Sequence, residues 1–229
     1  MPRLTERDEW LLDWFGVVRL SNMEGLRWAM AAANGWTEPV VVRRAQLWCT
    51  RMEALGGVSR VRLFGAGGSL VWATSARTGR PAPNLLSQTT RHEVAVSVVS
   101  ARYAAAGYEW ARDRRAQHAA DHQSDGIATG GEIVDAVEVE LTPKRAPRLR
   151  GIFRAYQRRM EAGELTHVTY LCTPDAARAT EEGLAEAAVA SAVRERVRIR
   201  TVFDARGVWE GDRQLDLLEQ PVSLDTGTR

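Results

Sequence analysis

The N-terminal part of the chain places its apolar side chains at the spacing of three short amphipathic helices. Thr5 is a good N-cap for the first helix, whose single apolar face is made by Trp10, Leu11, Trp14 and Phe15. The pattern predicts a second helix from about Ser21 to Gly35. It predicts a third that opens at Thr37-Glu38-Pro39, since Pro is tolerated in a first turn, and ends at Gly56-Gly57.

An alternating pattern of apolar and polar residues follows the third helix. Residues 58–64 and 69–74 alternate as strands do, and the glycine-rich stretch from Gly65 to Gly68 makes a turn between them. Three short helices followed by a β-hairpin is the order of a winged helix-turn-helix, which is therefore expected over residues 1–76. This order resembles the N-terminal domain of the replication-relaxation family of mobile-element proteins.

Arginines on this module are candidate DNA contacts. In a winged helix-turn-helix the third helix enters the major groove and the hairpin lies along the DNA backbone. The arginines on these two elements are Arg43, Arg44, Arg51, Arg60 and Arg62. The expected partner is double-stranded DNA, and the alternative is a solvated basic face on a winged helix that binds protein.

The composition changes after the hairpin. Residues 77–87 contain Gly and two Pro without periodicity, which predicts a linker. Residues 88–205 predict an α/β domain with the element order α-β-β-β-α-β-α-β and a central mixed sheet flanked by helices. One of its helices is expected from Pro174 to about Val193. Residues 206–229 are expected to form a C-terminal tail.

Two acidic residues share one face of an otherwise apolar strand in this domain. Glu138 and Glu140 are separated by a single residue, and side chains at such positions of a strand point the same way. Carboxylates in an apolar setting are costly unless a positive charge lies between them, which favours a divalent cation. Asp125 precedes the glycine-punctuated hairpin that leads into this strand.

Lys144 follows the same strand and is the only lysine among the 31 Lys and Arg residues. A chain that uses arginine almost everywhere is expected to place arginine wherever positive charge alone is needed. Lysine is a compact point charge with a tunable pKa, which suits a catalytic site. Chance is the alternative explanation for this single lysine.

Asp125, Glu138 and the nearby Lys144, followed by an amphipathic helix, resemble the PD-(D/E)XK nuclease superfamily, which has the restriction-endonuclease-like fold. The run His122-Gln123-Ser124-Asp125-Gly126 is similar to the H-x-P-D-G form of its first motif, with Ser124 where proline usually stands. The resemblance includes the order of helices and strands as well as the motif.

The resemblance implies a metal-dependent DNA endonuclease. Asp125, Glu138 and the carbonyl oxygen of Val139 would bind Mg²⁺ or Mn²⁺, which prefer hard oxygen ligands. Glu140 stands in the place of the usual lysine, so Lys144 would act from the following segment, orienting the attacking water or stabilising the transition state. Glu140 would then be a second ligand or a surface acid.

Other residues near the motif are further candidates. Glu93, in the first turns of the preceding helix, would help at the metal, or would be a solvated acid that complements the helix dipole. His122 is expected to contact phosphate or to support the site. Arg150 and Arg154 form a stripe with Arg158, which would contact phosphates or be a solvated face.

Two functions are compatible with these residues. The first is a Mg-dependent endonuclease that nicks or cleaves DNA, of the kind found with plasmids, phages or integrative elements. The second is a catalytically inactive DNA-binding protein that retains the nuclease fold and acts in replication, conjugative transfer or transcriptional regulation. A protein-binding adaptor is a third alternative, and a homodimer is left open.

Composition narrows the class of protein only slightly. Hydrophobic residues make up 45% of the chain and charged residues 26%, as in ordinary globular proteins, and a net charge of +2 permits nucleic-acid binding without requiring it. Cys49 and Cys172 are isolated, which predicts buried thiols.

The sequence lacks a G-x-S-x-G elbow and a G-x-x-x-x-G-K-[ST] loop, which sets aside serine hydrolases and P-loop NTPases. It also lacks an apolar signal core and a membrane-length apolar run, so a cytoplasmic protein with no membrane partner is expected.

Overall fold

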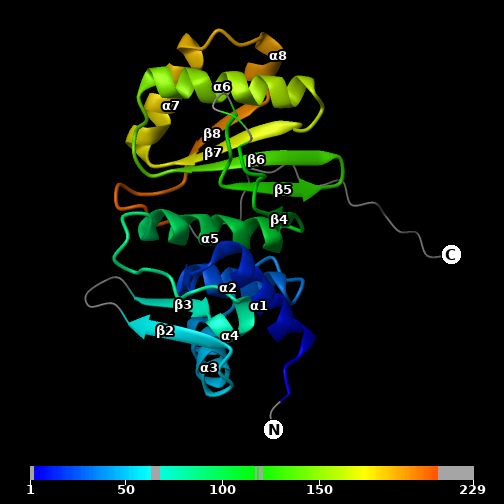
Figure 1. The fold of residues 1–229 in the computed structure, drawn as a ribbon, viewed down its shortest axis with the longest axis vertical. Coiled ribbons are helices and arrows are strands. Elements are labelled where there is room, and N and C mark those ends of the chain that lie inside the picture. The colour runs from blue at the N-terminus through cyan, green and yellow to red at the C-terminus, as the bar shows by residue number, and fades with distance from the viewer. Residues whose placement is uncertain (1–2, 63–67, 117, 119–120, 211–229) are drawn as a thin grey trace, which may run out of the picture.

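The computed structural model describes residues 3–62, 68–116, 118 and 121–210. It is a mixed α and β structure with two β-sheets, and a long helix, α5 (Thr90–Ala105), lies between them (Figure 1). None of the helices within these residues is long and apolar enough to cross a membrane.

The N-terminal half packs three helices around an apolar core and adds a small sheet. The helices are α1 (Glu6–Val18), α2 (Met23–Ala32) and α3 (Val42–Ala54). The strands are β1 (Ser21–Asn22), β2 (Val58–Arg62) and β3 (Ser69–Ala73), which form an antiparallel sheet in the order β1-β3-β2. Thr5 caps α1 as expected, in a reciprocal capping box with Asp8.

Two helix starts in this half differ from the expected ones. Ser21 pairs with Val71 in the sheet, and the Asn22 side chain accepts a hydrogen bond from the backbone N–H of Gly25 (2.9 Å), so α2 begins two residues later. The third helix begins at Val42 and not at residues 37–39. The segment before α3 is extended because Nε of Arg27, on α2, donates a hydrogen bond to the Val40 carbonyl oxygen (2.6 Å). The turn expected from Gly65 to Gly68 lies outside the described residues except for Gly68.

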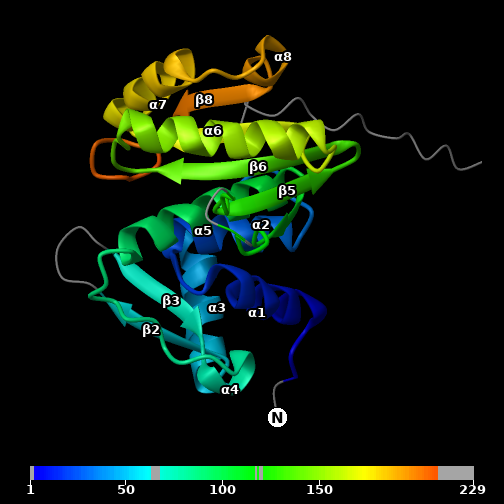
Figure 2. The same cartoon turned by 45° about the horizontal axis from the view of Figure 1, so that its top comes forward.

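The C-terminal half is a five-stranded mixed sheet with helices on both faces, as expected. The strands, in sheet order, are β4 (Glu109–Ala111), β5 (Gly126–Gly130), β6 (Ile133–Glu140), β7 (His167–Cys172) and β8 (Val197–Thr201). The pairs up to β6 are antiparallel and the later pairs are parallel. One face is covered by α6 (Ala146–Glu161) and α7 (Pro174–Glu186), and the other by α5 (Figure 2).

The helix predicted from Pro174 to about Val193 is interrupted. It ends at Glu186, and the short helix α8 (Ser191–Arg194) follows. The chain turns inward because Ala187 and Val189 are buried, and the Arg194 guanidinium donates to the carbonyl oxygens of both residues. Tertiary burial therefore overrides the helix propensity of this Ala-rich stretch.

The chain after β8 also differs from expectation. Residues 206–210 were expected to belong to the tail, but the Asp204 N–H donates to the Val208 carbonyl (2.8 Å), which closes a turn. The turn brings the Trp209 ring against Phe203, at 5.5 Å between ring centroids. Residues 211–229 of the expected tail lie outside the described residues.

Helix α5 contributes side chains to the apolar cores of both halves. Val96, Val99 and Tyr103 face the large sheet, whereas Ala101 and Ala105 belong to the core of α1, α2 and α3. Polar contacts add to this packing, since Trp14 Nε1 donates to Ser100 Oγ (3.0 Å) and Ser97 Oγ donates to Ser21 Oγ (2.8 Å). The expected linker, whose first two residues belong to the short helix α4 (Ser75–Thr78), thus joins two halves that are packed against each other. Cys49 and Cys172 are buried free thiols, as expected.

Candidate active site

The β5–β6 hairpin brings the motif acids together. Asp125 directly precedes β5, and the pairing of Gly126 with Val137 sets it opposite the last residues of β6. Its Oδ2 accepts a hydrogen bond from the backbone N–H of Val139 (2.8 Å). Glu138 and Glu140 are both buried and lie on the α6 face of the strand, as their alternation predicted.

Two neighbours orient the Glu138 carboxylate, which is 2% exposed. His122 Nε2 donates to Glu138 Oε1 (2.5 Å), and the hydroxyl of Tyr156 on α6 donates to the same oxygen. Burial and the charge of Glu138 raise the pKa of Tyr156 well above its ordinary value. Tyr156 therefore stays protonated and remains a donor. No hydrogen bond to Glu138 Oε2 exists among the described residues.

Lys144 lies at these acids. Its ammonium group contacts the Glu140 carboxylate and lies 4.0 Å from Glu138 Oε2, and its side chain is only 19% exposed. The single lysine of the chain is thus enclosed between two carboxylates. A lysine in bulk solvent would have argued against a role at this site.

Helix α5 contributes His92 to the site. His92 Nε2 lies 3.2 Å from Asp125 Oδ2 and 3.0 Å from the Val139 carbonyl oxygen. A carbonyl oxygen only accepts, so this nitrogen is the donor to both. Burial lowers the pKa of His92, but the hydrogen bond and charge of Asp125, with the Val139 carbonyl, outweigh it and raise the pKa above its ordinary value.

The residue expected from α5, Glu93, points elsewhere. Its carboxylate lies 3.5 Å from the Arg19 guanidinium in the N-terminal half. The positions of His92 and Glu93 around the helix could have predicted this difference. His92 lies one turn before Val96 and two turns before Val99, so it belongs to the stripe of α5 that faces the large sheet. Glu93 lies off that stripe.

A buried ion pair holds the segment that leads to Asp125. Arg159 of α6 forms two hydrogen bonds with the carboxylate of Asp113 (2.7 and 2.9 Å). The same carboxylate accepts from the backbone N–H (2.8 Å) and the hydroxyl (2.9 Å) of Ser124. Burial raises the pKa of Asp113, and the bonds from Arg159 and Ser124 outweigh it, so the pKa is lowered. Ser124, in the place of the motif's proline, thereby fixes the backbone next to Asp125.

Three oxygen atoms of the site suit a hard cation. Asp125 Oδ2 and the Val139 carbonyl oxygen face one point, because the same His92 nitrogen contacts both. The third oxygen is Glu138 Oε2, which lies 4.0 Å from the Lys144 ammonium. Within the described residues no group of three or more His, Cys, Asp or Glu side chains forms a metal cluster. Mg²⁺ needs no such cluster, since it binds one or two carboxylates and keeps several waters. Carboxylate and carbonyl oxygens are of the hard type that Mg²⁺ or Mn²⁺ prefers.

The candidate DNA contacts of the N-terminal half fall into two groups. Arg43, Arg44 and Arg62 are exposed, and Arg44 stacks over Trp36 at 4.9 Å. Arg51 and Arg60 instead pair with acids of the same half, Asp8 and Glu53. Arg60 and Arg62 also line a groove of about 610 Å³ between α3 and the hairpin of β2 and β3.

The arginine stripe on α6 does not lie beside the site formed by Asp125, Glu138, Glu140 and Lys144, which we call the acidic site. Arg154 is exposed, and Arg150 pairs with Glu186 of α7 (3.0 Å). Both lie on the solvent side of α6, since Arg154 is two positions from the buried Tyr156, about half a turn around the helix. These two arginines therefore lie on the solvent face of α6, and phosphate contact by them stays a prediction.

Comparisons with protein-family models, with curated proteins and with solved structures found no match. The functional interpretation depends on the geometry of the chain itself.

Proposed function

We propose that the protein is a metal-dependent DNA phosphodiesterase that nicks or cleaves duplex DNA. The observation that carries the proposal is the convergence of Asp125, Glu138 and the only lysine, Lys144, at the end of β6. Two carboxylates and a lysine that are brought together and largely shielded from solvent form a candidate catalytic site.

The order of elements supports the same proposal. The sequence α5-β4-β5-β6-α6-β7-α7-β8, with its mixed sheet, is the order expected for a PD-(D/E)XK core. The three helices and antiparallel hairpin of the N-terminal half have the order of a winged helix-turn-helix, which would deliver the site to DNA.

Each residue of the site has a part in this mechanism. Asp125, Glu138 and the Val139 carbonyl would hold Mg²⁺ or Mn²⁺, which lowers the pKa of a water and stabilises charge on the scissile phosphate. His122 and Tyr156 fix the orientation of Glu138.

Lys144 would supply a positive charge beside the scissile phosphate, since its ammonium group lies 4.0 Å from Glu138 Oε2. Glu140 holds the Lys144 ammonium at the site. A positive charge in this position favours the transition state, in which negative charge on the phosphate oxygens increases.

Cleavage of supercoiled plasmid tests the proposal. The full chain should nick the plasmid with Mg²⁺ or Mn²⁺ and not with a chelator, and Asp125→Ala should abolish nicking. Asp175→Ala removes an exposed carboxylate on α7 and should leave the rate unchanged. Equal nicking by Asp125→Ala and the wild type would refute the assignment of the site.

One observation favours a second candidate, a DNA-binding protein that keeps the nuclease fold without cleavage. The Lys144 ammonium contacts Glu140, and the His92 nitrogen lies between Asp125 and the Val139 carbonyl, so protein groups alone satisfy these charges. This candidate predicts salt-sensitive binding to duplex DNA and no cleavage with any divalent ion.

A further inference from the structure

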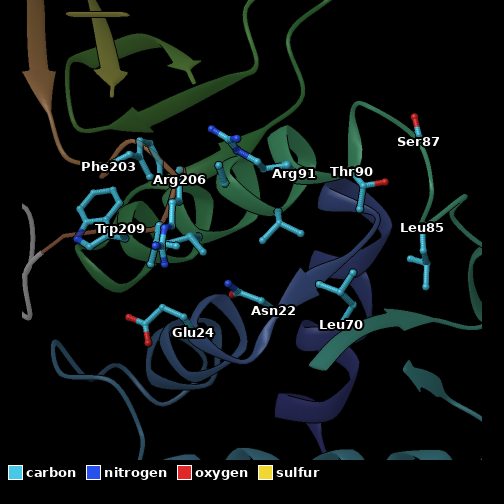
Figure 3. A pocket seen from close by; sticks show the side chains of 15 residues that line it. Asn22, Glu24, Leu70, Leu85, Ser87, Thr90, Arg91, Phe203, Arg206 and Trp209 are labelled. Atoms are coloured by element: carbon cyan, nitrogen blue, oxygen red, sulfur yellow. The ribbon is translucent and has the colours of Figure 1, made fainter. Parts of the chain in front are cut away.

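A pocket of about 600 Å³ lies between the N-terminal half, α5 and the turn that follows β8 (Figure 3). Its volume is in the range of small-molecule sites. It is separate from the acidic site, because none of Asp125, Glu138 or Lys144 lines it.

Apolar side chains form much of the wall of the pocket. Leu70 of β3 and Val94 of α5 form one side, and Phe203 and Trp209 form the other. The two aromatic rings contact each other at 5.5 Å between centroids, and the Arg102 guanidinium stacks on Trp209 at 4.3 Å. The turn after β8 is thus a packed wall.

Two arginines bring positive charge to this apolar space. Arg91 and Arg206 line the pocket from α5 and from the turn, as Figure 3 shows. Among the described residues neither side chain has an ion pair or hydrogen bond. The acid that lines the pocket, Glu24, is already bonded to the guanidinium groups of Arg27 and Arg102.

Arg91 is held against the turn. A Cβ atom added to Gly207 would lie 2.9 Å from Arg91 Nε, and Gly207 has a φ of 75° that favours glycine. The guanidinium therefore packs on bare backbone, at the border of the pocket. The next residue, His92, faces the acidic site, so the first turn of α5 borders both regions.

We propose that this pocket binds a small organic anion with an apolar body, of the aryl carboxylate or sulfonate class. The apolar walls would bury the body, and Arg91 and Arg206 would bond the acidic group, since guanidinium groups form strong charge-assisted hydrogen bonds with oxyanions. The proposal does not depend on nuclease activity.

Fluorescence titration of the full chain with anilinonaphthalene sulfonate tests the proposal, with uncharged N-phenylnaphthylamine as the matched probe. The sulfonate should bind the wild type more tightly than the amine. Arg91→Gln combined with Arg206→Gln should weaken sulfonate binding by about tenfold or more and leave amine binding unchanged, because hydrogen bonds to charged groups contribute that much. Arg91→Lys should weaken sulfonate binding less than Arg91→Gln does, because lysine keeps the charge but not the paired N–H donors.

Arg77→Gln, on α4 and outside the pocket, is the control and should bind the sulfonate as the wild type does. Circular dichroism would show that each variant is folded. Equal affinity of the two probes for the wild type, or unchanged sulfonate affinity in the double variant, would overturn the proposal.

Discussion

The Lys144 ammonium contacts Glu140 and lies 4.0 Å from Glu138 Oε2. If Lys144 acts in cleavage as proposed, both the charge and the size of its side chain affect the rate. Lys144→Arg keeps the charge but introduces a larger planar group that is effectively never deprotonated. We expect the Arg variant to lose nicking activity nearly as completely as Lys144→Ala, by about 100-fold or more. Affinity for duplex DNA should change little, since one phosphate contact among several is lost.

Nicking rates and fluorescence anisotropy with labelled duplex DNA would measure the two effects of the Lys144 variants separately. Full activity of Lys144→Arg would show that Lys144 supplies charge alone.

Asp135 is a buried acid outside the acidic site. Its carboxylate accepts hydrogen bonds from Tyr103 (3.0 Å) and Thr169 (2.7 Å). Burial raises its pKa from 3.8 to about 6, although these bonds and the charge of Arg198 act in the opposite direction. The folded protein therefore binds this proton more tightly than the unfolded chain does. This contribution to the free energy of unfolding is complete below the pKa that Asp135 has in the unfolded chain. It is lost as the pH rises through the folded-state pKa of about 6.

Asp135→Asn should therefore stabilise the protein at higher pH. The amide oxygen can still accept the two hydroxyl bonds, so the variant should gain about 3 kcal/mol of unfolding free energy near pH 8 and much less near pH 4. Urea unfolding at both pH values would measure the gain. An equal effect at the two values would contradict the raised pKa.

At the scale of elements, the segment from Asp113 to Asp125 depends on α6. Asp113→Ala leaves Arg159 without its bidentate partner and the backbone N–H of Ser124 without its acceptor. Loss of one partner from a buried ion pair costs about 3 kcal/mol or more, so the unfolding free energy should fall by that amount. Nicking should fall too, because Ser124 adjoins Asp125.

Chemical denaturation would measure the stability of Asp113→Ala. Asp175→Ala, whose carboxylate is exposed, should unfold as the wild type does. Wild-type stability of Asp113→Ala would show that this pair does not hold the segment.

Sequence periodicity predicted most elements of the fold, because their apolar faces are continuous over several turns or strand positions. It did not predict the two helix starts that single tertiary contacts determine: Ser21 pairs with Val71 in the sheet, and Arg27 holds Val40 extended. Spacing on one strand predicts that Glu138 and Glu140 share a face, whereas Asp125 was predicted from the motif resemblance and Lys144 from being the single lysine. Asp113 and Arg159 are far apart in the chain, so no local pattern could have paired them.

At the scale of the whole molecule, α5 links the two halves. It packs into both apolar cores, contributes His92 to the acidic site, and lines the pocket with Arg91. The proposed cleavage site and the proposed DNA-binding module would therefore move as one body rather than on a flexible tether.

The most direct test of the central claim compares two glutamates of the same hairpin. Glu138 is buried at the acidic site, and Glu132 is exposed in the turn at the other end of β6. Glu138→Gln should abolish Mn²⁺-dependent nicking of supercoiled plasmid, because it removes the carboxylate charge that would hold the cation, whereas Glu132→Gln should nick at the wild-type rate. Nicking by Glu138→Gln at the wild-type rate, or no nicking by the wild type with either divalent ion, would contradict a metal-dependent phosphodiesterase at this site.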